Sequence, residues 1–248
     1  MDDMSKNGDL SIGSLPPVLA RRFLAAVGTG GKRERTQAVL VQAAVQVFAA
    51  RGVAGATMQE VALVAGVTPG TVYNHFASKD ELAARVALTV GESLSLAIHD
   101  SCAQITDAAE RMAVGQRRYI WLAAQSPGWT LLLLDVVRAS PGVGVSLHRF
   151  PTEDLRLGIR QKVFKVPSEA AAIDMIAGIV STAMQRVALG QAPRNHDVAV
   201  ATLALRALGV AAELSAQVAR RPLPDLLDLP AEGVAGSKSR RPAPKTRR

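Results

Sequence analysis

The stretch Thr57–Leu82, TMQEVALVAGVTPGTVYNHFASKDEL, contains the signals that decide the fold. It opens on Thr57-Met-Gln-Glu60, the spacing in which a cap hydroxyl and a carboxylate three residues later satisfy each other's backbone amides. A helix is therefore expected to begin at Thr57. It should end at Gly66, because glycine tolerates the left-handed conformation that often follows a helix.

A second helix is expected almost at once, followed by a third. Thr68 is a suitable N-cap, and Pro69 takes the first helical position, where its missing amide hydrogen costs nothing. This short helix runs to about Phe76. Ser78-Lys-Asp-Glu81 then repeats the capping box and predicts a long helix from Lys79 to about Ile98.

Working outward, the residues before Thr57 predict another amphipathic helix, from about Arg33 to Arg51, with apolar side chains at spacings of three and four. Three short helices joined by a glycine-containing turn are typical of a helix-turn-helix. Downstream, helices are expected over about 105–125, 129–138, 151–166, 168–190 and 195–220. The predicted fold class is all-α with about nine helices, and no convincing strand pattern occurs.

The breaks between the expected helices, together with the composition of the two ends, divide the chain into four segments. Residues 1–31 are expected to be a disordered extension, within which Leu19–Val27 forms at most a transient helical turn or two. Residues 32–92 form the helix-turn-helix domain and 93–225 a second helical domain. Residues 226–248 are expected to be a disordered basic tail.

The net charge of +8 suggests a nucleic-acid partner, but the end of the tail, residues 238–248, holds six basic residues and no acidic one. The six are Lys238, Arg240, Arg241, Lys245, Arg247 and Arg248. The tail either adds non-specific attraction to phosphates or only keeps the protein soluble.

The single cysteine, Cys102, allows no internal disulfide and is expected to be a small buried helix residue. Neither a signal peptide nor an uncharged apolar run of about 18 residues occurs, so the expected location is the cytoplasm, without a membrane. The histidines lack metal-ligand spacing, and neither a metal nor a cofactor is expected. His99, His148 and His196 are expected at the surface or at helix ends.

Residues 33–90 resemble the DNA-binding domain of the tetracycline-repressor (TetR) family. The resemblance rests on Ala43-Ala44, Phe48, Gly52, the stretch Thr57–Phe76 and Ser78–Leu82, and above all on Tyr73-x-His75-Phe76 followed by Ser78-Lys79. It implies a transcriptional regulator that binds double-stranded operator DNA as a homodimer. Residues beyond about 95 match the family only in outline, as an Ala-, Leu- and Val-rich helical domain.

The helix that begins at Thr68 is the expected recognition helix, because its small and polar start can approach base edges in a major groove. An Asn side chain can make two hydrogen bonds to adenine, and a Thr methyl can contact a thymine methyl. The base-reading candidates are Thr68, Pro69, Gly70, Thr71 and Asn74.

Contacts to backbone phosphates are implied by the resemblance for Thr57, Tyr73, His75 and Lys79, and helix N-termini at Thr57 and Lys79 favour phosphate. Alternatives stay open: Tyr73 as a half-buried brace, His75 as a core residue, and Thr57 as a cap in either case. Arg33 and Arg35 are further phosphate candidates, or belong to a solvated basic run.

The second domain is implied to hold a largely apolar small-molecule ligand and to dimerise through the helices over 168–190 and 195–220. Residues at helical spacing suit packing against a second copy, or burial within their own bundle: Val198, Ala201, Leu205, Leu208 and Ala212. The candidate pocket residues, each of which can equally be plain core, are Met112, Trp121, Trp129, Phe164, Met175 and Met184.

The expected mechanism is a repressor that a ligand releases from its operator. Two alternatives remain: an activator or ligand-independent regulator of the same fold, and an architectural DNA-binding protein. An enzyme is not expected. The sequence has no catalytic carboxylate pair, phosphate-cradling glycine loop or nucleophile elbow.

Overall fold

The computed structural model describes residues 15–26, 31–139 and 147–226, and within these ranges the protein is entirely helical. The helices are α1 (Pro17–Ala26), α2 (Lys32–Gly55), α3 (Met58–Ala65), α4 (Pro69–His75), α5 (Lys79–Ser101), α6 (Ala108–Gln125), α7 (Pro127–Ala139), α9 (Arg149–Arg160), α10 (Glu169–Ala188), α11 (His196–Ala207) and α12 (Ala212–Ala219). The all-α prediction is confirmed. Eleven described helices replace the expected nine or so.

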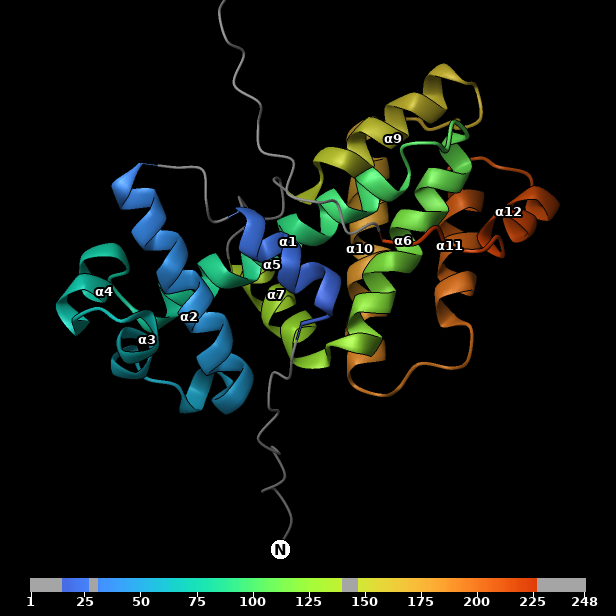
Figure 1. Ribbon diagram of the computed structural model, residues 1–248. Helices are drawn as coiled ribbons and strands as arrows, with labels where there is room; N and C mark the ends of the chain where they lie inside the picture. Colours follow the sequence, from blue (N-terminus) through green and yellow to red (C-terminus); the bar gives the residue numbers. More distant parts are fainter. Residues whose placement is uncertain (1–14, 27–30, 140–146, 227–248) are drawn as a thin grey trace, which may run out of the picture.

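The helices form two groups that α5 connects (Figure 1). Helices α2, α3 and α4 lie at one end of the molecule, α6 and α9–α12 lie at the other, and α1, α5 and α7 lie between them. The expected boundary between residues 92 and 93 therefore falls inside one continuous helix.

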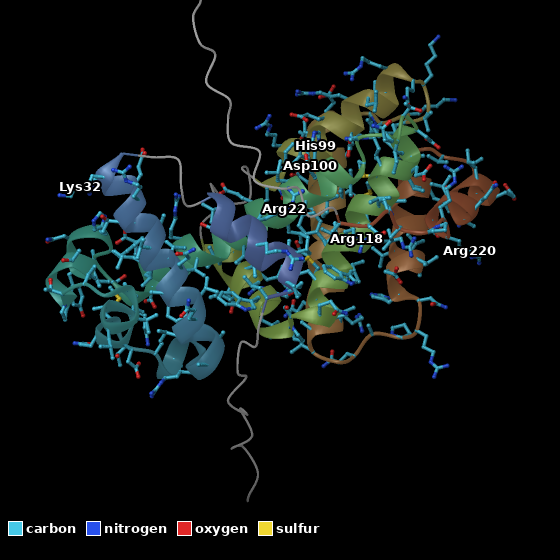
Figure 2. The ribbon with its side chains drawn as sticks, in the orientation of Figure 1. Arg22, Lys32, His99, Asp100, Arg118 and Arg220 are labelled. Carbon is cyan, nitrogen blue, oxygen red and sulfur yellow. The ribbon has the colours of Figure 1, made fainter. Side chains whose placement is uncertain are left out.

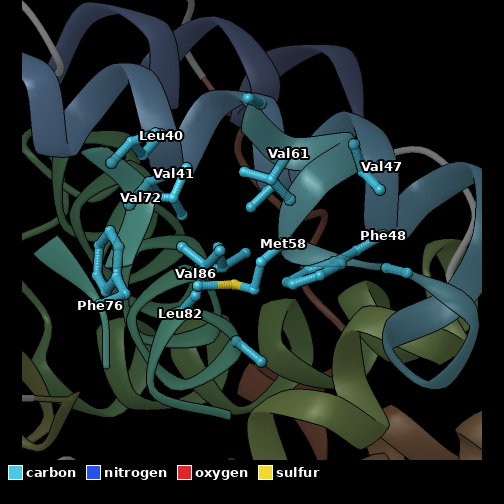
Figure 3. Packing of buried hydrophobic residues seen from close by; sticks show 14 of the residues in the cluster. Leu40, Val41, Val47, Phe48, Met58, Val61, Val72, Phe76, Leu82 and Val86 are labelled. Carbon is cyan, nitrogen blue, oxygen red and sulfur yellow. The ribbon is translucent and has the colours of Figure 1, made fainter. Parts of the chain in front are cut away.

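The first group closes around a small apolar core (Figure 3). Leu40 and Phe48 of α2 are fully buried against Val61 of α3, Val72 of α4 and Leu82 of α5. Such contacts stabilise short helices that are marginal alone, because apolar burial contributes about 25 cal/mol per Å². The start of α5 therefore belongs to this core.

Helix α2 ends as a regular helix where the sequence predicts it. Gly52 has φ 69° and ψ 165°, outside the helical region, although helical turns resume to Gly55. Among the described residues, α2 alone has the length and apolar composition of a membrane-crossing helix. Core helices of soluble proteins share these properties, and the core in Figure 3 accounts for its buried side.

Residues 17–26 correct the expectation of a disordered extension over residues 1–31. They form α1, which packs along α5. Leu19 is fully buried in a cluster with Leu94, and Arg22 forms an ion pair with Asp100 at 2.7 Å (Figure 2). Long-range burial orders a segment whose local sequence looks irregular. Residues 1–14, 27–30 and 227–248 lie outside the described residues, so the expected disorder there stays a prediction.

The expected helix over 195–220 is two helices, α11 and α12. They are separated at Gly209, whose φ of 94° is rarely adopted by other residues. The backbone of Lys165 lies close to Gly209, and the Lys165 amide donates to the Leu208 carbonyl at 2.8 Å. This long-range hydrogen bond holds the chain at the break.

The expected dimer stripe on α11 lies mostly inside its own bundle. Ala201, Leu205 and Leu208 are fully buried in one cluster with α6, and Val198 packs against it. Ala212, which starts α12, is exposed. The alternative of burial within one chain is therefore right for this stripe. The solvent-facing side of α11 includes Leu203, which is 59% exposed.

Candidate DNA-binding surface and regulatory cavity

The caps predicted from the sequence define the start of α3 and the start of α4. The Thr57 hydroxyl accepts from the Glu60 amide at 3.2 Å, and the Glu60 carboxylate accepts from the Thr57 amide at 2.9 Å. Gly66 ends α3 with φ 67° and ψ 32°, the left-handed conformation expected of it. Helix α4 begins three residues later, which confirms the helix-turn-helix geometry.

The start of α4 presents the base-reading candidates to solvent. Thr68 caps the helix by accepting from the Thr71 amide at 3.3 Å, and the two threonine hydroxyls lie 3.0 Å apart. Thr68, Pro69, Gly70 and Asn74 are exposed and Thr71 is half-buried. Val72, on the opposite side of α4, is fully buried. The helix thus has one side in the core and its polar N-terminal turn free.

The phosphate candidates lie around this helix in different settings. Tyr73 is 49% exposed, which is compatible both with a phosphate contact and with a half-buried brace. His75 is half-buried, and its Nδ1 is buried without a hydrogen-bond partner among the described residues. Thr57, Arg33 and Arg35 are exposed. None of these positions prevents a phosphate contact.

Lys79 and Glu81 make contacts that the sequence pattern does not predict. The Lys79 ammonium donates to the carbonyl oxygens of Ala54 and Ala56, at 3.0 and 3.1 Å, and so closes the end of α2. In the second expected capping box, the Ser78 hydroxyl accepts from the Glu81 amide as predicted. The Glu81 carboxylate, however, accepts from the Ala77 amide instead of the Ser78 amide. A phosphate at Lys79 has to share an ammonium that is already hydrogen-bonded.

A cavity lies among α5, α6, α7, α9 and α10, where the second group of helices meets α5 and α7. It holds about 90 Å³ of free space, enough for several water molecules. Most of its wall is apolar: Ile98, Met112, Leu133, Leu134, Val137, Leu147, Phe150, Pro151, Ile173, Ile176, Ala177, Val180 and Met184. An apolar cavity with a few polar groups is the usual form of a small-molecule site.

Two of the six candidate pocket residues, Met112 and Met184, line this cavity. The other four do not. Trp129 is fully buried in the core cluster shared with the helix-turn-helix, and Phe164 packs against Gly158. Trp121 lies under the Arg118 guanidinium, 5.5 Å from its ring, and Met175 packs in a neighbouring cluster. Size alone does not distinguish core from cavity, because large side chains serve both.

The polar residues of the cavity wall are the ones that sequence reasoning missed. Gln116 and Tyr119 lie one turn apart on α6, and Ser95 and His99 lie four residues apart on α5. Asp154 of α9 and Ser181 of α10 also line the cavity. The signal was present in α6, since Gln116 is a polar residue at a position that helical spacing buries among Met112, Ala113 and Ile120. His99 and His148 do lie at helix ends, as expected, but they also line the cavity.

Burial shapes the electrostatics of this wall. It raises the pKa of the Tyr119 hydroxyl, against a hydrogen bond with Ser95. It also raises the pKa of Asp154, opposed by the Arg111 guanidinium, whose Nε lies 2.5 Å from a carboxylate oxygen. Cys102 is buried as expected, at the end of α5, and burial raises the pKa of its thiol. No group of three metal-ligating side chains occurs in the described ranges.

Two family models match the chain. "Bacterial regulatory proteins, tetR family" matches residues 40–86, and "Tetracyclin repressor-like, C-terminal domain" matches residues 107–221. The Probable HTH-type transcriptional regulator ArpR of Pseudomonas putida is 29% identical over 178 residues, which are 71% of this chain and 78% of that protein. The HTH-type transcriptional regulator TtgR, also of Pseudomonas putida, is 28% identical over the same shares.

Solved structures agree with this relationship. RolR in complex with resorcinol has a TM-score of 0.67 at 26% identity, covering 79% of this chain and 98% of that one. FadR of Bacillus subtilis in complex with stearoyl-CoA has a TM-score of 0.54 at 20% identity, covering 70% of this chain and 97% of that one. At that identity FadR supports the fold alone.

Proposed function

Because the chain belongs to the tetR family of bacterial regulatory proteins and is a DNA-binding transcriptional regulator, we propose that it is a cytoplasmic repressor released from its operator by a small molecule. The observation that carries the proposal is α5. Its first turns supply the buried Leu82 and Val86 to the helix-turn-helix core, and its last turns supply Ser95 and His99 to the cavity.

We propose that α4 enters the major groove and reads bases through Thr68, Pro69, Gly70, Thr71 and Asn74. The exposed polar start of α4 supports this, because no other described part of the chain covers it. Phosphate contacts are proposed for Arg33, Arg35, Thr57, Tyr73, His75 and Lys79. They fix the position of α4 on the duplex without reading the sequence.

We propose that two copies pair through α10 and the solvent-facing side of α11. Leu203 lies exposed on α11, and Gly178 is exposed on α10, where a second helix can approach closely. A two-fold dimer sets the two recognition helices at a fixed distance. That distance has to match about one turn of DNA for both to bind.

The cavity is the proposed ligand site, with Met112 and Met184 on its wall. A ligand acts by binding the DNA-free arrangement more tightly than the DNA-bound one. A preference of about 100-fold supplies roughly 2.7 kcal/mol of coupling. Since α5 contacts both the cavity and the DNA-binding core, it is the proposed route.

The first test is selection of bound sequences from a random duplex pool at near-physiological salt. A two-fold-symmetric site is expected, and its absence contradicts the dimeric helix-turn-helix proposal in favour of architectural binding. Transcription from a promoter that carries the site then distinguishes repression from activation. A compound that releases the protein supports ligand control, whereas binding in the cavity without release favours a ligand-independent regulator.

A further inference from the structure

The helix-turn-helix itself carries little positive charge. From Met58 to His75, which includes α3 and α4, the chain has no lysine or arginine. Residues 32–92 together hold six basic and five acidic side chains. Two of the six are engaged within the protein, because Arg51 pairs with Glu60 at 3.0 Å and Lys79 donates to two backbone carbonyl oxygens at the end of α2. Few cations in this domain are therefore left to neutralise the phosphates of a duplex.

The sequence has a second concentration of positive charge in residues 238–248, here called the basic run. It holds six basic and no acidic side chains. The basic run lies outside the described residues, so the structure bears on it only through the point at which the described chain stops. A charged segment adds to DNA affinity when its tether lets it reach the duplex.

Residues 221–226, here called the strap, lead the chain from α12 back toward the middle of the molecule (Figure 1). Leu223 and Leu226 of the strap pack against a cluster that contains Leu19 of α1 and Leu94 of α5. The described chain therefore stops beside the helices that lie between the two groups. It does not stop at the far end of the molecule, where α12 lies.

Three arginines hold the strap on α6. Arg117 donates to the Arg221 carbonyl at 2.7 Å, and the buried Arg118 donates to the Pro224 carbonyl. The Arg221 side chain pairs with two carboxylates at the start of α6. These contacts fix the path of the strap along its length, and so they fix the point from which the rest of the chain starts.

From this point the basic run is within reach of DNA bound at α4. Leu94, which marks the level of the strap, lies about 22 Å along α5 from Lys79 at the start of that helix. The chain between Leu226 and Lys238 spans at most about 40 Å. The tether is therefore long enough for the run to contact the duplex next to the bases that face α4.

We infer that the basic run of each copy is a second DNA-contacting element, which binds phosphates of the duplex beside the site that α4 reads. The inference rests on the proposed placement of α4 on DNA. Phosphate contacts carry no sequence information. The run therefore raises the affinity and its salt dependence, and it leaves the preferred sequence unchanged.

The first test compares the full chain with a variant that lacks residues 238–248. Each is titrated, over a range of salt concentrations, into a duplex that holds only the selected site and into one extended by about one helical turn on each side. If about three of the six cations in each copy contact phosphates, truncation lowers the slope of log K against log salt by about 5 for a dimer on the longer duplex. Only the full chain is expected to prefer the longer duplex. Equal slopes for the two proteins overturn the inference.

The basic run can be tested separately from operator recognition. On a duplex without the selected site, truncation is also expected to weaken binding, because phosphate contacts do not depend on sequence. If selection finds no preferred site while truncation still lowers the slope, the operator proposal fails and the inference stands. If the truncated chain selects a different sequence, the run reads bases and the inference is overturned.

The second test removes charge without shortening the chain. One variant carries Lys245→Gln, Arg247→Gln and Arg248→Gln, and its affinity for the longer duplex at near-physiological salt is expected to fall about tenfold. A control variant makes the same change in net charge at exposed positions at and after the end of α9: Arg160→Gln, Lys162→Gln and Lys165→Gln.

The control variant is expected to bind within about twofold of the parent, because these positions lie at the opposite end from α4 and exposed charges are screened beyond about 10 Å at 0.1 M salt. Equal losses in the two variants show that net charge, and not the position of the basic run, controls the affinity, and they overturn the inference. Unchanged affinity with lower solubility in the first variant also overturns it and assigns the run a solubilising role.

Discussion

Tyr73 is expected to contribute little to the stability of the fold and much to DNA binding. Its side chain is 49% exposed on α4, so Tyr73→Ala is expected to leave the melting temperature within a few degrees of the parent. Affinity for the selected operator is expected to fall at least tenfold, because the ring and its hydroxyl meet the phosphate backbone in the proposed complex. Fluorescence anisotropy with a labelled duplex measures this.

Tyr73→Phe separates the hydroxyl from the ring. If the hydroxyl donates to a phosphate, the Phe variant binds more weakly than the parent and more tightly than the Ala variant. Parent-like affinity in Tyr73→Ala places the recognition surface elsewhere.

Gly158 and Gly115 are both helical glycines, and they are expected to respond oppositely to alanine. A Cβ at Gly158 lies 2.0 Å from the Phe164 ring, which is itself buried. Gly158→Ala is therefore expected to lower the free energy of unfolding by roughly 1–3 kcal/mol through overpacking. Apart from its chain neighbours and the nearby backbone of α6, a Cβ at Gly115 meets no heavy atom of the described residues within 4 Å, so Gly115→Ala is expected to raise the free energy of unfolding by up to about 1 kcal/mol.

Urea denaturation of both variants checks this pair. If Phe164 is the obstacle, Phe164→Leu partly restores the stability of Gly158→Ala. Equal effects of the two alanine substitutions contradict the packing described around α9.

Local rules at the residue scale succeed where the partner is close in sequence. Thr57, Thr68 and Gly66 behave as their spacing predicts because their partners lie within four residues. The hydrogen bonds of Lys79 could not be predicted, because its acceptors, Ala54 and Ala56, are distant in sequence and precede α3. Gln116 is missed for a related reason, since only the packed bundle shows that its oxygen has no partner among the described residues.

At the element scale, α1 is the clearest test of long-range packing. Leu19 is fully buried against α5, and its truncation to Ala in a tight core costs about 2–5 kcal/mol. The expected loss in global stability is smaller, because α1 can detach while the rest stays folded. Hydrogen exchange is therefore expected to speed up in residues 17–26 of Leu19→Ala before the melting temperature changes much.

Leu96→Ala is the matched control, because Leu96 is an exposed leucine on the neighbouring α5. It is expected to leave exchange in α1 unchanged. Slow exchange of α1 in Leu19→Ala contradicts the docking of this helix.

Which segments form helices could be predicted from the sequence, but which helices pack against each other could not. Apart from α1, the described helices follow from apolar spacing and caps, with α11 and α12 expected as one helix. Helix α1 depends on burial by α5, and the break at Gly209 depends on the Lys165 backbone. Apolar spacing on α11 also could not show whether Ala201 and Leu205 face their own bundle or a second copy, because both interfaces need the same pattern.

At the scale of the whole molecule, the proposed dimer determines whether both recognition helices reach DNA together. Leu203 is 59% exposed on α11, and in the proposed dimer it faces its symmetry mate. Leu203→Glu places like charges in an apolar interface, so sedimentation is expected to show monomers at micromolar concentration. Operator affinity is expected to fall about 100-fold or more, since each half-site then binds alone. Leu214→Glu, at an exposed position of α12, is the control and is expected to stay dimeric. If Leu203→Glu also sediments as a dimer, the copies pair through another surface, and the spacing of recognition helices has to be derived from that surface instead.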